Sequence, residues 1–264
     1  MIKEKEMKIL VLIGSPKGKG IGYRIAQSLE KKMKQLGDVD FEYILLKENN
    51  IELCKGCFLC VLKGREFCPL KDGLQEIDEK IGLSDGIVLV SPCYVYNVSW
   101  LMKNFIDRFA YTNHRPKFFT QKLLLIANAG SGMEKTLEAM RNTFGIGPEL
   151  VDELAYLSPP WPLSDRVMIK QDSAVEKAAV RLFRAIKGKK KRVPKLTDYI
   201  RFRFFKHVSV KVKDFIPADY KYYKDKESYY YPARINLFKK LAASLMLKIG
   251  MFMMRDMEPP KPKD

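Results

Sequence analysis

Short apolar runs along the chain alternate with longer stretches in which apolar residues recur every three or four positions. The runs at residues 7–13, 41–46, 86–90 and 123–127 are of strand length, and residues 154–157 form a weaker fifth. Strands covered on both faces read as unbroken apolar runs, so these segments predict a buried parallel sheet. Helical spacing predicts helices between them, at residues 22–36, 72–81, 99–109 and 134–144. The alternation predicts an α/β fold with helices on both faces of the sheet.

The loops that follow the strands are the candidate site, because ligands of such sheets bind beyond the carboxyl ends of the strands. The first loop, GSPKGKGIG at residues 14–22, matches neither common glycine-rich phosphate motif. Its glycines, the helix behind it, and Ser15, Lys17 and Lys19 still suit a phosphate, with an ordinary tight connection as the alternative. The loop SPCYVYNVS leads into a helix capped by Ser99, and the loop NAGSG at residues 128–132 is small, which suits a flat ring system.

These motifs resemble those of the NADPH-dependent FMN reductase family of flavodoxin-like proteins. The resemblance covers about residues 7–160 and lies in G-S-P-x5-G, in S-P-x-Y before a helix ending in K-N-F-I-D-R, and in the later glycine-rich loop. It implies a three-layer sandwich around a five-stranded parallel sheet of order 2-1-3-4-5 that binds FMN.

The same resemblance implies which residues would contact FMN. The phosphate would bind Ser15, Lys17, Gly20, Ile21, Gly22 and Tyr23, with Lys19 beside them, and the isoalloxazine would lie on Pro92, Tyr94, Val95, Tyr96, Asn97 and Gly130. Relatives usually carry Asn-Thr where this chain has Ile21-Gly22, so a hydroxyl that would bind the phosphate is missing.

Four of the five cysteines lie within fifteen residues in the pattern C-x2-C-x2-C-x7-C, formed by Cys54, Cys57, Cys60 and Cys68. Thiolates at this spacing bind iron–sulfur clusters or zinc, and three cysteines at x2 intervals favour a cluster. The chain has two histidines, which leaves little for a mixed Cys/His zinc site. The pattern is similar to that of the iron–sulfur flavoproteins, a branch of the same family that binds [4Fe-4S] beside FMN and works as a dimer. Zinc, or no metal with reactive thiols or a reversible disulfide, stays open, and Cys93 is interpreted as a small buried residue.

The positive charge is concentrated in the C-terminal third of the chain. Residues 1–180 hold 25 Lys and Arg against 23 Asp and Glu, whereas residues 181–264 hold 23 against 8. We therefore expect a flavodoxin-like FMN-binding domain at 1–180, with its cysteine-rich loop at 54–68, and a basic, partly helical extension at 181–264. Such a charge run is either a solvated face or a contact for nucleic acid or an anionic membrane.

An apolar run at residues 241–254 lies near the end of the extension. It is too short to span a bilayer, which takes about 20 residues. The run predicts a dimer-interface or core-packing helix over about residues 235–255, with membrane-surface binding as the alternative.

The composition of the chain narrows the classes of protein to which it can belong. With 47% apolar and 30% charged residues, disorder throughout and a polytopic membrane protein are excluded. The start of the chain shows no signal-peptide pattern, so a cytoplasmic protein is expected. Neither histidine stands beside an obvious nucleophile, which disfavours a hydrolytic triad and predicts no catalytic side chain, since a flavin would carry the chemistry.

The sequence thus predicts an NAD(P)H-linked, FMN-dependent oxidoreductase that passes electrons between FMN and a [4Fe-4S] cluster. Its partners would be a small-molecule or protein electron donor and acceptor, and it would be a homodimer or larger. One alternative is an NAD(P)H-dependent flavin or quinone reductase without a cluster. A second is a non-catalytic binding protein on a flavodoxin scaffold.

Overall fold

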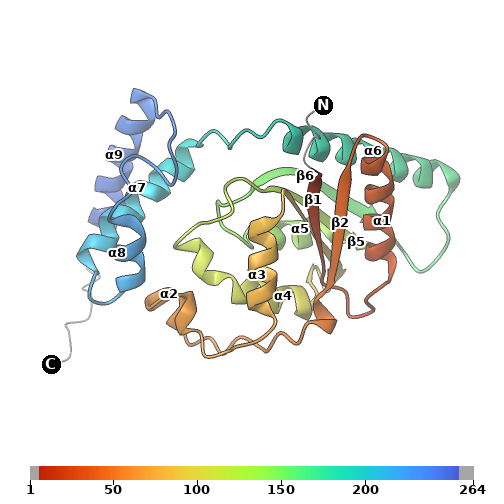
Figure 1. Ribbon diagram of the computed structural model, residues 1–264, viewed down its shortest axis with the longest axis horizontal. Coiled ribbons are helices and arrows are strands. Elements are labelled where there is room, and N and C mark those ends of the chain that lie inside the picture. The colour runs from red at the N-terminus through yellow and green to blue at the C-terminus, as the bar shows by residue number, and fades with distance from the viewer. Residues whose placement is uncertain (1–5, 256–264) are drawn as a thin grey trace. The chain divides into compact units, whose positions relative to one another are not determined.

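The computed structural model describes residues 6–255, and its contacts group the chain into two compact units (Figure 1). The first unit contains the residues up to Cys54, Leu70–Phe109 and Lys117–Lys191. The second contains Lys55–Pro69, Ala110–Pro116 and the residues from Arg192 onward. Most of the cysteine-rich loop therefore belongs to the same unit as the C-terminal extension.

A parallel sheet forms the centre of the first unit. Its strands are β1 (Met7–Ile13), β2 (Val39–Leu45), β3 (Gly86–Tyr94), β5 (Lys122–Ala129) and β6 (Glu149–Leu157), in the order β2-β1-β3-β5-β6. All four pairings between these strands are parallel. The two-residue strand β4 (Asn97–Val98) pairs antiparallel with the end of β3. The structure confirms the predicted α/β fold and strand order, with β4 as an addition.

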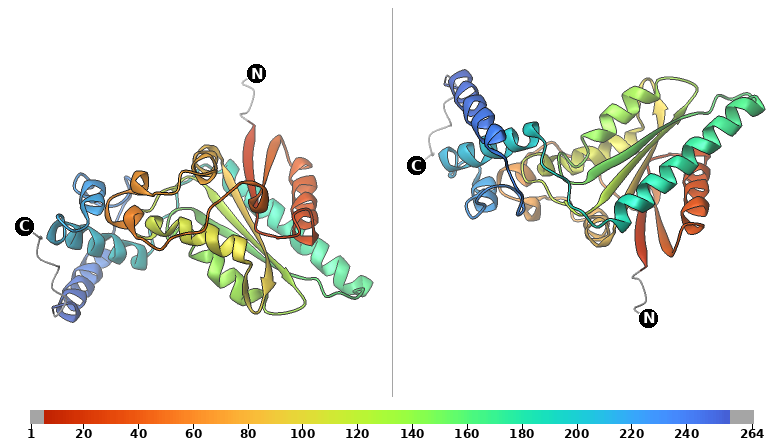
Figure 2. Two further views of the ribbon diagram at one scale, coloured as in Figure 1. Left: turned by 90° about the horizontal axis from the view of Figure 1, so that it is seen from below. Right: turned by 90° about the horizontal axis from the view of Figure 1, so that it is seen from above.

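Helices cover both faces of this sheet (Figure 2). On one face α1 (Ile21–Lys34) packs beside α6 (Asp165–Lys187), and both bury apolar side chains in one core with β1 and β3. On the other face lie α3 (Leu74–Leu83), α4 (Trp100–Arg108) and α5 (Met133–Arg141). The predicted helices are thus confirmed to within a few residues. Helix α6 was not predicted from the sequence, and the expected domain boundary at residue 180 falls within it.

The second unit consists of helices and short helical turns, several of which pack around aromatic side chains. The elements are α2 (Leu59–Leu62), the 3₁₀ turns η2 (Arg65–Phe67) and η3 (Ala110–Asn113), α7 (Leu196–Lys211), α8 (Pro217–Tyr223) and α9 (Leu237–Met253). Phe202 is fully buried, with its ring centroid 5.0 Å from that of Tyr230 and 6.0 Å from that of Tyr223. Burial raises the pKa of Tyr230 to about 12, so this tyrosine is uncharged at neutral pH. Buried aromatic rings, rather than aliphatic side chains, therefore form the core around Phe202.

Candidate cofactor site

A pocket of about 440 Å³ opens in the first unit, where the loops after β1, β3 and β5 meet. The order of the sheet reverses between β1 and β3, and ligands of doubly wound sheets bind at this switch point. The volume lies in the range of small-molecule sites. The lining residues are Ser15, Lys17, Gly20, Ile21, Gly22, Arg24, Pro92, Cys93, Tyr94, Asn128, Ala129, Gly130 and Ser158.

The pocket brings together eight of the residues that the sequence assigned to FMN. They are Ser15, Lys17, Gly20, Ile21, Gly22, Pro92, Tyr94 and Gly130. Five others are not among the lining residues. The Lys19 ammonium lies 5.9 Å from the centre of the Tyr23 ring, and that ring packs on Tyr43. Val95 and Tyr96 form an exposed turn with φ of +49° and +58°, and the side chain of Asn97 accepts a hydrogen bond from the Val98 amide.

The loop after β1, residues 14–22, forms one side of the pocket through its main-chain conformation. The Gly18 amide donates to the Ser15 carbonyl at 2.9 Å, and Gly18 itself has φ of +65°. This turn ends at Gly20, the N-cap of α1, so the positive end of a 14-residue helix points to the pocket. A Cβ at Gly22 would lie 2.7 Å from Cγ1 of Val90. Glycine at position 22 therefore lets α1 approach β3 closely.

Two buried serines, Ser91 and Ser99, form hydrogen bonds near the ends of β1 and β3. Ser99 caps α4 as predicted, because its Oγ accepts from the Met102 amide at 3.1 Å. The same hydroxyl donates to the Gly14 carbonyl. The Ser99 amide donates to Ser91 Oγ at 3.1 Å. The buried Ser99 hydroxyl thus links the end of the loop after β3 to the loop after β1.

Five lining residues were missing from the sequence prediction: Arg24, Cys93, Asn128, Ala129 and Ser158. Cys93 is partly exposed rather than buried, which corrects its interpretation as a core residue. Asn128 is 8% exposed, and its Nδ2 donates to Ser158 Oγ at 3.3 Å. Its buried Oδ1 has no hydrogen-bond partner among the described residues. A buried acceptor without a partner is costly, so this atom fits a ligand that brings an N–H group.

The lining is positive. Lys17 and Arg24 contribute cations, and within the described part of the chain no Asp or Glu lines the pocket. Together with the amino end of α1, this charge suits an anion such as a phosphate. The position of Asn128 at the end of β5 was the signal that could have found it in the sequence.

The main chain before the first cysteine is anchored to α4 within the first unit. The Cys54 amide donates to Asn104 Oδ1 at 2.9 Å, and Asn104 Nδ2 donates to the Glu52 carbonyl at 3.1 Å. Arg108 donates to the same carbonyl at 2.7 Å and forms a bidentate ion pair with Asp72 at 2.6 and 3.0 Å. Burial alone would raise the pKa of Asp72, but hydrogen bonds from Arg108 and from two main-chain amides lower it.

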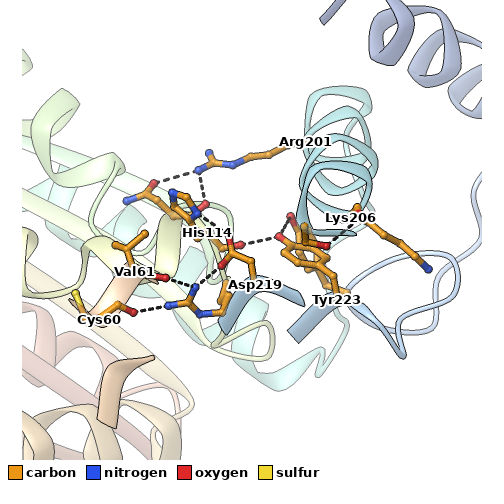
Figure 3. A network of polar contacts seen from close by, with 11 residues as sticks. Cys60, Val61, His114, Arg201, Lys206, Asp219 and Tyr223 are labelled. Carbon is orange, nitrogen blue, oxygen red and sulfur yellow. Dashed lines mark hydrogen bonds and ion pairs between the residues drawn. The ribbon is translucent and has the colours of Figure 1, made fainter. Parts of the chain in front are cut away.

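The following part of the loop, with Cys60, is anchored to α8 within the second unit (Figure 3). Arg115 donates to the carbonyl oxygens of Cys60 and Val61, the latter at 2.8 Å, and forms an ion pair with Asp219. His114 Nδ1 lies 2.7 Å from the other carboxylate oxygen of Asp219, which is only 3% exposed. We call Arg115, Asp219 and His114 the Asp219 network.

The four cysteines fit a metal or cluster in kind and spacing. Cys54 and Cys57 are exposed, whereas Cys60 and Cys68 are partly exposed. Gly56 and Phe58, with φ of +62° and +56°, turn the main chain sharply beside Cys57. Within residues 6–255, however, no group of three or more His, Cys, Asp or Glu side chains is arranged to hold a metal ion. The four thiols are suitable metal ligands, but among the described residues their side chains are not arranged around one metal position.

A doubly wound parallel sheet with a positively lined pocket at its switch point defines a flavodoxin-like α/β protein. The chain belongs to the NADPH-dependent FMN reductase family, whose model matches residues 7–152. This match includes the loops after β1, β3 and β5 and also the cysteine-rich loop.

Several relatives are named iron-sulfur flavoproteins. One from Archaeoglobus fulgidus is 33% identical over 110 residues, which are 42% of this chain and 49% of that protein. One from Methanocaldococcus jannaschii is 29% identical over 55% of this chain and 75% of that protein. One from Methanosarcina thermophila is 28% identical over 52% of this chain and 72% of that protein. The chain thus spans about half the length of the Archaeoglobus relative.

Solved structures share the fold. The NAD(P)H:quinone oxidoreductase from Methanothermobacter marburgensis matches with a TM-score of 0.52 and 18% identity, over 67% of this chain and 100% of that chain. A protein from Klebsiella pneumoniae named a putative quinone reductase matches with a TM-score of 0.52 and 14% identity, over 67% and 85% of the two chains. At these identities the likeness shows the fold alone.

Proposed function

We propose that the protein is an FMN-dependent oxidoreductase that takes reducing equivalents from NAD(P)H. The observation that carries the proposal is the positively lined pocket beside the amino end of α1. One helix N-terminus with Lys17 suits a single terminal phosphate, as in FMN. Tyr94 and the small residues Ala129 and Gly130 suit a flat ring, and Asn128 Oδ1 would accept a hydrogen bond from its N–H group.

Bound FMN would supply the hydride and electron chemistry, whereas residues of the chain bind and orient it. Replacement of Ser15 and Lys17 together by alanine should weaken FMN binding by at least about tenfold, since charge-assisted hydrogen bonds to the phosphate would be lost. Equilibrium titration of flavin fluorescence measures this. Lys31→Ala, in the last turn of the same helix, is the matched control and should leave affinity unchanged. Equal affinities for the double variant and wild type would contradict the placement of the phosphate.

We further propose that Cys54, Cys57, Cys60 and Cys68 together hold one [4Fe-4S] cluster. Four thiols within fifteen residues, together with the names of the related proteins, support this. Thiolates confined so closely repel one another unless a metal neutralises their charge. The cluster would exchange single electrons with FMN, which can take up two. The chain's own contribution is to hold the loop, through Asn104 at Cys54 and through Arg115 at Cys60.

Iron and sulfide analysis after anaerobic reconstitution tests the cluster. Wild-type protein should hold about four irons per chain and give a low-temperature paramagnetic signal after reduction with dithionite. Cys57→Ala should lose both while still binding FMN. Cys93→Ala removes the one cysteine outside the motif and should retain both, which controls for the loss of a thiol.

The second candidate is an NAD(P)H-dependent flavin or quinone reductase without a cluster. It is supported by the family match, which is to the NADPH-dependent FMN reductases. Wild-type protein that holds FMN but well under four irons, with no paramagnetic signal, would select this candidate. The donor and acceptor, small molecules or proteins, and the homodimer expected from the sequence stay predictions; a mass measurement in solution tests the latter.

A further inference from the structure

Helix α9 leaves a large apolar face exposed. Of its 17 residues, Ala243 alone is classed as buried. Leu241, Leu245 and Phe252 expose 63%, 61% and 64% of their surface. The other large exposed side chains are Leu237, Phe238, Met246, Ile249 and Met253. Their spacing of three, four and seven positions places them on one side of the helix.

The orientation of α9 is fixed by contacts on its opposite side. Ala243 lies on this side, and a Cβ at Gly250 would come within 3.6 Å of the Phe204 ring of α7. The Asn236 side chain caps the helix by accepting from the Lys239 amide at 2.9 Å. Lys239 Nζ donates to the Pro194 carbonyl at 2.8 Å. Because α9 is held in this way, its apolar face points away from α7.

The C-terminal segment that contains this face is strongly basic. Residues 192–255 contain 15 Lys and Arg against 5 Asp and Glu, a balance of +10. Two of these acids, Asp198 and Asp219, are buried in ion pairs with Arg192 and Arg115. Helix α9 itself contains no acidic residue, and its exposed Lys240 and Lys248 lie along one border of the apolar face.

We propose that α9 binds an anionic membrane surface. Its apolar side chains would enter the boundary between headgroups and acyl chains, with Lys240, Lys248 and Arg255 at the lipid phosphates. A helix of 17 residues is about 25 Å long, and none of the helices in residues 6–255 is long and apolar enough to cross a membrane. The helix would therefore lie in the plane of the interface.

Charge favours a membrane over a second copy of the chain as the partner of this face. Two copies that met through α9 would bring together two segments of the same sign, each with a balance of +10. An anionic bilayer instead attracts every exposed lysine and arginine near its surface. This inference is independent of the proposed redox function, because it uses no residue of the pocket or of the cysteine motif.

Flotation with lipid vesicles tests the proposal on the full chain. The protein should bind vesicles of phosphatidylcholine mixed with phosphatidylglycerol and should not bind phosphatidylcholine alone. Leu245→Glu should weaken binding by at least about tenfold, because a charge would have to enter the apolar boundary. Lys240→Gln should weaken binding by about fivefold. Val210→Glu adds the same charge to an exposed apolar position of α7 and serves as the control, since it lies outside α9.

A second measurement does not depend on the folding of the Leu245 variant. Phe252→Trp keeps the position aromatic, and its fluorescence should be quenched by brominated acyl chains in anionic vesicles, beyond any quenching of Trp100 and Trp161 in wild type. No binding to anionic vesicles would overturn the proposal. Binding that Leu245→Glu and Val210→Glu reduce equally would also overturn it, as adsorption by charge alone. A wild-type dimer that ignores vesicles and that Leu245→Glu converts to a monomer would identify a second copy as the partner.

Discussion

The Asp219 network offers the sharpest test of how the extension supports the cysteine-rich loop. Asp219 lies on α8 and is almost completely buried, and its two oxygens face Arg115 and His114. Arg115, about 10% exposed in its side chain, also binds the carbonyl oxygens of Cys60 and Val61. Asp219→Asn keeps the shape of the side chain but removes its charge. Arg115 would then lose the one carboxylate with which it forms an ion pair in the described network.

The expected destabilisation is large. Removal of one partner of a buried ion pair costs about 3–5 kcal/mol, because the other charge stays buried without compensation. The asparagine can still accept one hydrogen bond, so we expect a loss near the lower end, about 3 kcal/mol. Asp225→Asn is the matched control, since Asp225 is exposed and lies 4.0 Å from Lys224. An exposed pair of this kind contributes at most about 1 kcal/mol.

Hydrogen exchange measured by mass spectrometry reports on the two anchored segments separately. In Asp219→Asn the amides of α2 and α8 should exchange faster, by about two orders of magnitude for 3 kcal/mol of local opening. The amides of β1 and β3, in the other unit, serve as the internal reference. Exchange in α2 as slow as in the Asp225→Asn control would refute the argument that the network holds the loop.

Three further variants test other parts of the structure. Ser99→Ala should lower the free energy of unfolding by about 1 kcal/mol, as measured by urea denaturation, because α4 loses its cap. Gly22→Ala should cost about 1–3 kcal/mol, whereas Gly20→Ala, whose nearest contact would be 3.6 Å away, should be tolerated; equal effects would contradict the close approach of α1. The pKa of Asp72 is lower in the folded state than in the unfolded state, so its stabilising effect is present above the unfolded value of about 3.9 and is lost as pH falls through the folded value. The stabilities of wild type and Asp72→Asn, followed against pH, should therefore differ at neutral pH and converge in acid; a constant difference would contradict the ion pair with Arg108.

The sheet could be predicted because its central strands are buried on both faces. β1, β3 and β5 consist of nearly unbroken buried apolar residues, and the sequence located them to within a few positions. β6 was predicted only at residues 154–157. Glu149, Asp152 and Glu153 are partly exposed along it, so its first half does not read as an apolar run. Edge position alone does not explain the difference, because β2 is also an edge strand and was predicted to within two residues of its bounds.

The helices α6 and α7 were not predicted from the sequence. The buried face of α6 consists of Val175, Ala178, Ala179, Leu182, Phe183 and Ile186 at helical spacing, so the periodic signal for this helix is present in the sequence. In α7 aromatic and basic residues alternate on all sides, and the helix has no marked apolar face. Its core contacts include aromatic rings from the segment around residues 229–231. Tertiary contacts, rather than local periodicity, define α7.

Only some of the pocket residues could be predicted, because the others depend on tertiary contacts. Loops directly after strands could be assigned from the sequence, and Ser15, Pro92 and Gly130 from these loops line the pocket. Ser158 could not be assigned in this way, because it depends on the register of β6, in which Ala129 pairs with Leu157 and the Ser158 amide donates to the Ala129 carbonyl at 2.7 Å. Arg115 and Asp219 are separated by 104 residues, and no local pattern connects them.

Helix α4 explains how one family motif serves two parts of the first unit. At its amino end Ser99 donates to the Gly14 carbonyl, next to the loop that would hold the phosphate. Near its carboxyl end Asn104 and Arg108, from the motif K-N-F-I-D-R, hold the main chain at Glu52 and Cys54. Neither of these two residues lines the pocket. Because α4 is a single helix of nine residues, its two ends tie the loop after β1 and the main chain at the first cysteine to the same element. The motif that resembles a flavin-binding signature therefore supports, in its second half, the main chain at Glu52 and Cys54.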